Sequence, residues 1–243
     1  MIDAKPIVPV NPAGLDEVAK SLLEGDPDSP PFTSSVNANV RNPETYLIVP
    51  GKTHGNYSYP DLLVAMERTN LGSNWNHSHE ALHYENAFML SIRQYIDFLQ
   101  LLKSGNVYDG RGAKLDNGKV NKILDEILEK RDPLRAEWLD AKFSQSGKIT
   151  NFTYHKIKSD GTIEDVTEPL QKCLMEDAYV NLFNANSQGL PTKKSKSKET
   201  YYWYPKDKSV ARFGANSITA LLGGSWDPEG SYSLLGVRAA RLK

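Results

Sequence analysis

The residues best suited to chemistry lie between His77 and His83. The run His79-Glu80-Ala81-Leu82-His83 satisfies the H-E-x-x-H motif. On a helix its two histidines lie one turn apart and can bind zinc together, while the glutamate acts as general base. His77 adds a third imidazole nearby. One hypothesis is therefore a zinc-dependent hydrolase that uses His79, Glu80 and His83.

Four features of the sequence argue against that hypothesis. Glu85 lies where zinc peptidases of this type usually carry an apolar residue, and Asn86 stands where the extended motif requires glycine. No downstream carboxylate is recognisable as a third ligand, and the aromatic neighbours Trp75 and Tyr84 are typical of a half-buried helix start. We expect a structural role for the motif, with no metal and no cofactor, and keep the hydrolase as the alternative.

Other catalytic patterns are weaker. The sequence contains no P-loop, no G-x-S-x-G and no G-x-G-x-x-G motif. Glu137 and Asp140 flank Trp138 and could form an acid pair, but a buried tryptophan with flanking ion pairs is the simpler interpretation. Cys173 has no base nearby in the sequence that would make it a nucleophile, so it is expected to be a small core residue. The sequence therefore predicts a protein that is not an enzyme.

Composition excludes two classes of partner. The chain has 243 residues, 39% of them hydrophobic, and a net charge of −1, which argues against a nucleic-acid-binding protein. The lysine-rich run at 193–198 is expected to be a solvated surface segment. No apolar run approaches the roughly 20 residues of a membrane helix, and the first residues lack the layout of a signal peptide. We expect neither nucleic-acid binding nor membrane insertion.

Sequence periodicity predicts a mixture of helices and strands. The first 45 residues suggest an arm with one helix at Leu15–Leu23. Further along, we expect a strand at 46–49, a strand or helix at 61–66, helical periodicity over 78–103 with a capping box at Ser91–Gln94, and a second helix at 120–130. We also expect a hairpin from strands 150–157 and 162–166 around the turn 159–161, a short helix at 169–175, a loop at 184–199 and a strand at 200–204.

The segment from Val210 to Lys243 interleaves two kinds of residue. The first kind, which we call the frame residues, comprises Val210, Ala211, Phe213, Ala215, Ser217, Ala220, Pro228, Ser231, Ser233 and Leu235 to Ala240. The second kind has no evident folding role and comprises Gly214, Asn216, Ile218, Thr219, Leu221, Ser225, Trp226, Gly230, Tyr232 and Leu234. From Gly230 to Leu235 the two kinds nearly alternate, and in an extended segment alternate side chains lie on opposite sides. The pattern predicts one anchored side and one side presented to a ligand.

Four segments together resemble one family. They are residues 80–99, Arg135 to Ala141, Tyr202 to Pro205, and Val210 to Arg241. In these segments the chain resembles a variable protein of a diversity-generating retroelement, of the type found in archaea, their viruses and small-genome bacteria. The resemblance covers roughly 60–243 and leaves 1–59 as an N-terminal extension. It implies an α+β, C-type lectin fold, with small twisted antiparallel sheets and two main helices, related to the formylglycine-generating enzyme.

The resemblance also implies a function. In such systems a reverse transcriptase copies a template repeat, randomises its adenines and overwrites the 3′ end of the gene, here about 212–240. The ten residues without a folding role would then be the variable, ligand-binding positions, with Trp226 and Tyr232 as anchors. The partner would be a protein or glycan, such as a host surface receptor, met at a virion or cell surface. Catalysis like that of the formylglycine-generating enzyme is not expected, because Cys173 lies outside the C-terminal segment.

Adenine mutation accounts for the residue types at these positions. An asparagine codon mutated at its adenines can encode the types found at Gly214, Ile218, Thr219, Leu221, Tyr232 and Leu234, and Trp226 can arise from an arginine codon. Phe213, Leu222, Leu235 and Val237 are expected to hold the segment by burial. Arg238 is expected to make a buried, charge-assisted contact that fixes the C-terminal strand.

Overall fold

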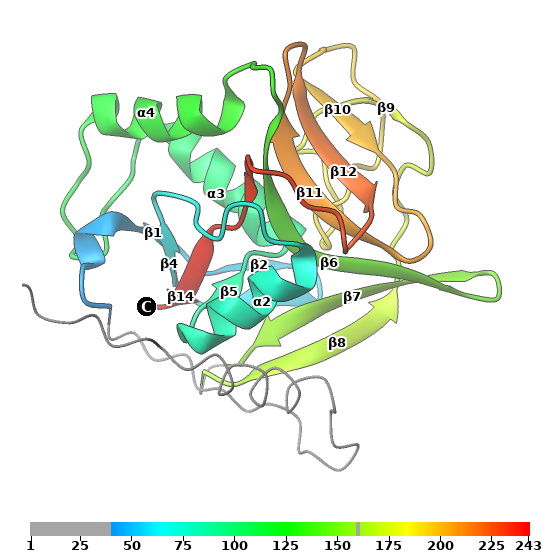
Figure 1. Ribbon diagram of the computed structural model, residues 1–243, viewed down its shortest axis with the longest axis horizontal. Coiled ribbons are helices and arrows are strands. Elements are labelled where there is room, and N and C mark those ends of the chain that lie inside the picture. The colour runs from blue at the N-terminus through cyan, green and yellow to red at the C-terminus, as the bar shows by residue number, and fades with distance from the viewer. Residues whose placement is uncertain (1–39, 159–160) are drawn as a thin grey trace, which may run out of the picture. The chain divides into compact units, whose positions relative to one another are not determined.

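The computed structural model describes residues 40–158 and 161–243. The predicted helix at Leu15–Leu23 and two residues of the predicted turn at 159–161 lie outside the described residues. Within them, three α-helices accompany several mainly antiparallel sheets (Figure 1). The prediction of an α+β protein is therefore confirmed at the level of class. None of the described helices has both the length and the apolar character needed to cross a bilayer.

The two main helices were predicted correctly. Helix α3 (Ile92–Ser104) begins at a capping box in which the Ser91 and Gln94 side chains bond to each other's backbone amides. It ends at Gly105, which has a left-handed φ of 68°. Helix α4 (Asn117–Leu128) follows, capped by the Asp116 carboxylate, which accepts from the Lys119 amide.

The region 78–103 is not one continuous helix. Helix α2 (Trp75–Tyr84) begins at Asn74, whose side chain accepts from the His77 amide. It stops before Asn86, which adopts a left-handed φ of 54°. Strand β5 (Phe88–Met89) then separates α2 from α3. Helical spacing of apolar residues persists across this break, which is why periodicity alone did not reveal it.

The smaller sheet holds the C-terminal strand. Its strands are β1 (Tyr46–Val49), β4 (Leu62–Ala65), β14 (Ala239–Leu242) and β5, in the order β1-β4-β14-β5. The ambiguous segment at 61–66 is thus a strand. A separate hairpin joins β2 (Lys52–His54) to β3 (Tyr57–Tyr59).

The larger sheet carries the C-terminal segment that precedes β14. Its order is β8-β7-β6-β11-β12-β10-β9, with β13 (Leu235–Gly236) pairing in parallel with β6. The strand bounds are β6 Arg135–Ser146, β7 Ile149–Ile157, β8 Ile163–Pro169, β9 Ala178–Val180, β10 Thr200–Trp203, β11 Ser209–Ala215 and β12 Ala220–Trp226. The predicted hairpin and the strand at 200–204 are confirmed, whereas β6, which pairs with β7, β11 and β13, was not predicted as a strand.

The helix predicted at 169–175 is wrong. Pro169 is instead the last residue of β8, and no helix follows it within the described chain. The amides that a helix would use are bound by another segment: Gln171 N donates to the Gln188 side chain at 2.9 Å and Leu174 N to the Pro191 carbonyl at 2.8 Å. A tertiary partner for the backbone thus replaces the local helix.

The inner face of the larger sheet contains a buried ionic cluster, which we call the charged core. It consists of Arg135, Glu137 and Arg238, each no more than 1% exposed. Arg238 donates to the two Glu137 oxygens at 2.6 and 3.1 Å, and Arg135 donates to Glu137 as well. The predicted contact of Arg238 is therefore confirmed. Trp138, 1% exposed, has the predicted environment of a buried tryptophan with flanking ion pairs.

Candidate ligand-binding face and histidine cluster

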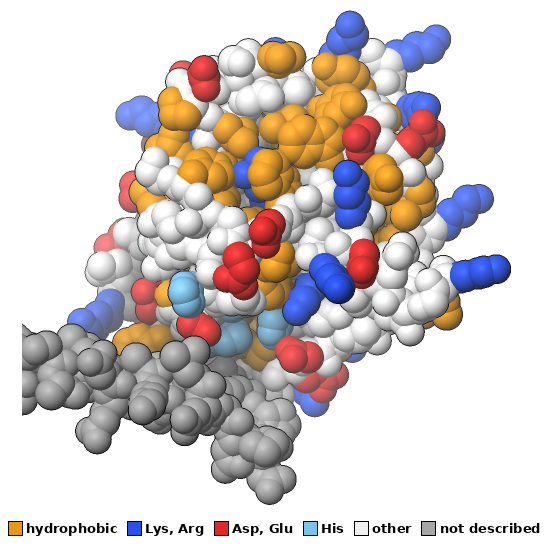
Figure 2. Space-filling view, turned by 45° about the vertical axis from the view of Figure 1, so that its right-hand side comes forward, with side chains coloured by type: hydrophobic (Ala, Val, Ile, Leu, Met, Phe, Trp, Pro, Cys, Tyr) orange, Lys and Arg blue, Asp and Glu red, His pale blue; other side chains and the backbone are white. Residues whose placement is uncertain are grey.

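A row of half-buried aromatic side chains lies on the outward face of strands β9, β10 and β12. Tyr179 pairs in register with Tyr201, which pairs with Leu221 on β12. The next residue, Leu222, pairs with Phe213 on the opposite, inner face. We call Tyr179, Tyr201, Trp203, Trp226 and Tyr232 the aromatic face. Figure 2 shows hydrophobic side chains gathered over this part of the molecule.

The rings of the aromatic face contact one another in sequence. Tyr179 and Tyr201 have centroids 5.0 Å apart, Tyr201 and Trp203 6.4 Å, and Trp203 and Trp226 5.6 Å. Trp226 lies over Gly223, where an added Cβ would come within 2.5 Å of its indole nitrogen. The absence of a side chain at Gly223 is therefore what allows Trp226 to pack along the sheet.

Arg212 completes this face in an unusual setting. Its guanidinium stacks on the Trp226 ring, lies 5.5 Å from the centroid of the Tyr232 ring, and donates to the Tyr232 hydroxyl at 3.2 Å. Among the described residues no carboxylate pairs with it, and its buried Nη2 has no hydrogen-bond partner. Burial lowers the pKa of Arg212 to about 10, so the side chain stays charged at neutral pH. A buried cation with an unused donor is suited to binding an acceptor group of a ligand.

The predicted variable positions divide by exposure. Ile218 is 66% exposed. Six others are half-buried and reach the surface: Asn216, Ser225, Trp226, Gly230, Tyr232 and Leu234. Seven of the ten positions thus have surface that a partner could contact.

Three predicted variable residues are buried, which corrects the expectation that they face a partner. At Gly214 an added Cβ would lie 2.5 Å from the Arg135 carbonyl oxygen. The Thr219 hydroxyl donates to the Glu199 carbonyl at 3.0 Å, and its side chain is 4% exposed. Leu221 is on the outward face but only 7% exposed, in register with Tyr201. Close backbone approach and neighbouring strands, which a single sequence does not show, account for this.

Exposure alternates from Gly230 to Leu235 as predicted, but the residues expected to be anchored are the exposed ones, and those expected to face a ligand are half-buried. The frame serines Ser231 and Ser233, like Ser217, are exposed, while Tyr232 and Leu234 are half-buried. The segment is not an extended strand but two successive turns, closed by Gly230 N to the Asp227 carbonyl at 3.1 Å and Leu235 N to the Tyr232 carbonyl at 2.9 Å. The expectation that these serines anchor the segment is therefore wrong.

Asn216 also has a structural role. Its side-chain oxygen accepts from the amides of Ile218 and Thr219 at 2.9 and 2.8 Å, which closes the turn between β11 and β12.

Three residues of the aromatic face, Tyr179, Tyr201 and Trp203, were not predicted from the sequence to bind a ligand. The sequence Tyr201-Tyr202-Trp203 could have indicated two of them, because in a strand Tyr202 points to one face and the two flanking rings to the other; Tyr202 is buried and the flanking rings are half-buried.

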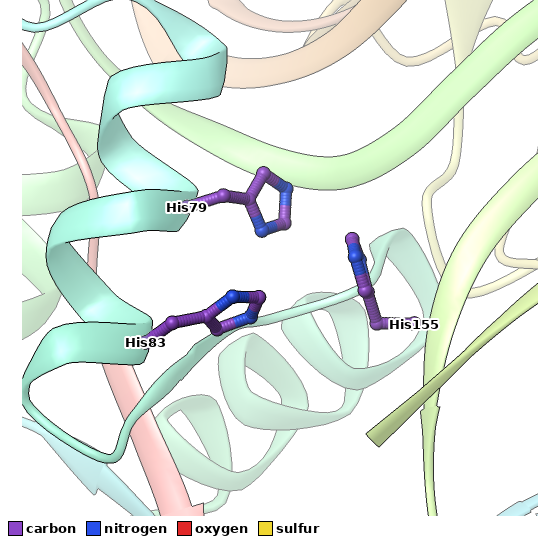
Figure 3. A group of neighbouring side chains, drawn as sticks. All are labelled: His79, His83 and His155. Atoms are coloured by element: carbon purple, nitrogen blue, oxygen red, sulfur yellow. The ribbon is translucent and has the colours of Figure 1, made fainter. Parts of the chain in front are cut away.

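A second cluster of functional side chains lies between helix α2 and strand β7. His79 and His83 project from α2 toward His155 on β7 (Figure 3). One ring nitrogen of each lies within 4.8 Å of the others. The ring centroids of His79 and His155 are 4.6 Å apart, and Trp75 covers the other side of His79 at 4.2 Å. The sequence motif thus gains a third imidazole from a distant strand.

The charge states of the three imidazoles differ. Burial lowers the pKa of His79 to about 3, so this ring is neutral at pH 7. Burial also lowers the pKa of His83. Burial opposes protonation of His155 as well, but the carboxylates of Asp140 and Asp165 outweigh it and raise its pKa to about 9. Asp140 accepts from the Nδ1 and the backbone amide of His155 at 2.8 and 2.7 Å, which fixes the ring.

The sequence showed no downstream carboxylate as a third ligand, and the structure instead brings a histidine, His155, beside His79 and His83. His77, the third imidazole suggested by proximity in the chain, is exposed and is not part of the cluster. An open pocket of about 510 Å³ leads to His79 and His155, and its walls include Glu80 and Glu229. The carboxylate of Glu229 is held by the Asn74 and Asn76 side chains at 2.9 Å. The pocket therefore reaches from the histidine cluster to the C-terminal segment.

Comparisons with known proteins assign this chain to no family. The chain was compared with protein-family models, with curated proteins and with solved structures. None of the three comparisons found a significant match.

Proposed function

We propose that this chain is a ligand-binding variable protein of a diversity-generating retroelement, with a C-type lectin fold and no catalytic role. The observation that carries the proposal is that Arg212 stacks on Trp226 and donates to the hydroxyl of Tyr232. Two residues that the sequence marks as variable here contact a cation that has no carboxylate partner among the described residues. Tryptophan, tyrosine and arginine are the residue types that dominate binding hot spots.

The support beneath this face fits the same proposal. The inner side of β11 and β12 is fixed by Phe213 and Leu222, at 1% and 2% exposure, and by the charged core around Glu137. Strand β11 is buried on both faces, and the half-buried or exposed side chains of this region lie at the end of β12 and in the turns at 216–218 and 227–234. Substitutions there cost little stability when they avoid buried contacts. A rigid support with a tolerant surface is the arrangement that diversification requires.

The chemistry of the face indicates what kind of ligand this variant takes. Aromatic rings supply apolar contact area, and Arg212, buried beside two of these rings, supplies a positive charge and one unused donor. A protein loop that inserts a carboxylate or carbonyl among apolar side chains would match both features. We therefore favour a protein partner over a glycan for this sequence.

The gene locus provides the direct test. We expect a near-copy of the sequence that encodes residues 212–240, differing at adenines, beside a reverse-transcriptase gene. Amplicons from a natural population should then vary at the codons of Ile218, Trp226 and Tyr232 and stay constant at those of Phe213 and Arg238. A complete locus without such a repeat, or variation spread evenly along the gene, would refute the proposal.

A further inference from the structure

We infer that His79, His83 and His155 form a binding site for one divalent transition-metal ion of the zinc class. This inference is independent of the proposed ligand-binding face. It rests on three imidazoles from two separate elements that converge on one space (Figure 3). Imidazole nitrogen is a preferred ligand for zinc and for similar transition metals.

The strongest observation is the state of His79. Its side chain is 9% exposed, and neither ring nitrogen has a hydrogen-bond partner among the described residues. The buried Nε2 of His83 lacks one as well. Leaving buried polar atoms unsatisfied is costly, and a structure retains them where an ion or ligand supplies the missing partner. A metal ion would satisfy both rings at once.

The surroundings of His155 match the environment of a metal ligand. Asp140, 1% exposed, accepts from its Nδ1. The Nε2 of His155 lies 3.0 Å from the carboxylate of Asp165, an exposed side chain that a metal ion bound at Nε2 would displace. A carboxylate that holds the far nitrogen of a ligating histidine is the usual supporting contact in zinc sites. Asp140 also lies 3.5 Å from the Nε2 of His79 without hydrogen-bonding to it, so its negative charge is close to two of the three rings.

Access and local movement are compatible with binding. The pocket of about 510 Å³ opens onto His79 and His155 and carries further carboxylates at Glu80 and Glu229. Zinc bonds to nitrogen at about 2.0–2.1 Å, which places tetrahedral ligands about 3.3 Å apart, so the rings must move inward when the ion binds. His83 and His155 are only half-buried and have room for this adjustment. The remaining coordination position is left for water.

The chain offers a matched pair of variants for the test. His83→Gln removes a member of the cluster, whereas His77→Gln removes an exposed histidine of the same helix and pocket. The full chain is freed of metal with a chelator and titrated with Zn²⁺ against a chromogenic competitor, and Co²⁺ is used as a spectroscopic probe. We expect one equivalent of Zn²⁺ to bind, with an affinity that falls more than about tenfold in His83→Gln and changes less than about twofold in His77→Gln.

A second measurement separates loss of the site from loss of the fold. Zn²⁺ should raise the melting temperature of the parent chain and of His77→Gln, but not that of His83→Gln or His155→Gln. Metal-free His83→Gln should melt close to the metal-free parent, since this side chain is half-buried. Absence of stoichiometric binding, or equal losses in His77→Gln and His83→Gln, would overturn the inference.

Discussion

Two arginines on opposite faces of the larger sheet show how differently the same side chain can be used. Arg238 lies on the inner side, 1% exposed, and donates twice to the Glu137 carboxylate. Arg212 is nearly as buried at 4%, but its neighbours are the rings of Trp226 and Tyr232. Carboxylate pairing raises the pKa of Arg238 despite burial, whereas burial without such a partner lowers the pKa of Arg212.

The difference is between an arginine whose hydrogen bonds are all made and one that keeps an unused donor. Arg238 is fully paired, so it ties β14 to β6 and has nothing left to offer a ligand. Arg212 keeps an unsatisfied donor, a buried nitrogen next to the half-buried rings of Trp226 and Tyr232. A group whose interactions are incomplete in the free protein gains more from a partner than one already satisfied. If this difference is real, stability should depend strongly on the first arginine and only weakly on the second.

The largest effect is expected for Arg238→Met. The substitution keeps much of the side-chain volume but leaves Glu137 buried beside Arg135 alone. Breaking a buried ion pair by removing one partner costs about 3–5 kcal/mol, and we expect that loss in the free energy of urea unfolding. The control is Lys194→Met, which breaks an exposed pair with Glu176 and should cost less than about 1 kcal/mol. A loss below that control would contradict the structural role of the charged core.

A slightly smaller contribution to the free energy of unfolding is expected from the ionised carboxylate of Glu137. Burial opposes ionisation of this group, but Arg135 and Arg238 outweigh it and lower its pKa from 4.5 to about 2. Because the pKa is lower in the folded state, this stabilisation is present above pH 4.5 and is lost as the pH falls toward 2. The shift corresponds to about 3 kcal/mol.

The pH dependence can be isolated with Glu137→Gln. The difference in unfolding free energy between the parent chain and the variant should be largest above pH 4.5 and shrink steadily between pH 4.5 and 2. Unfolding in urea at several pH values measures it. A difference that does not change over this range would show that the carboxylate is not held ionised by the two arginines.

Sequence reasoning identified the structural side of this comparison more accurately than the recognition side. The capping box at Ser91 and the buried contact of Arg238 follow from local rules and from charge burial, and both are confirmed. The alternation of side-chain exposure over residues 230–235 was predicted, but the exposed and the more buried positions were interchanged. Whether Tyr232 or Ser231 points outward depends on two turns and on pairing with β6, which alternation alone does not specify.

Contacts between residues far apart in the sequence explain the other features that the sequence did not predict correctly. His155 lies more than seventy residues from His79 along the chain, and only the packing of β7 against α2 brings the rings together. Similarly, in the segment 169–175, where a helix was expected, backbone amides donate instead to the Gln188 side chain and the Pro191 carbonyl. In both cases the deciding partner is supplied by tertiary structure, so no local pattern could have indicated it.

A moderate effect is expected for Trp226→Ala. The ring covers Gly223, contacts Trp203 and stacks on the Arg212 guanidinium. Removing a half-buried ring and its cation–π contact should lower the unfolding free energy by about 1–2 kcal/mol. Ile218→Ala, at a site 66% exposed, should change it by less than about 0.5 kcal/mol. Equal effects at the two positions would show that Trp226 is not packed into the face.

The smallest effect on stability, and the one that best separates the two arginines, is expected for Arg212→Met. Because no described carboxylate depends on Arg212, its removal leaves no buried anion unpaired, and methionine can still pack against Trp226 and Tyr232. The unfolding free energy should therefore change by less than about 1 kcal/mol, against about 3–5 kcal/mol for Arg238→Met. If the two methionine variants were equally unstable, the unsatisfied donor of Arg212 would have to be part of the fold. If Arg212→Met folds normally, the cation is retained for something other than stability, and binding is the role that its position among half-buried rings supports.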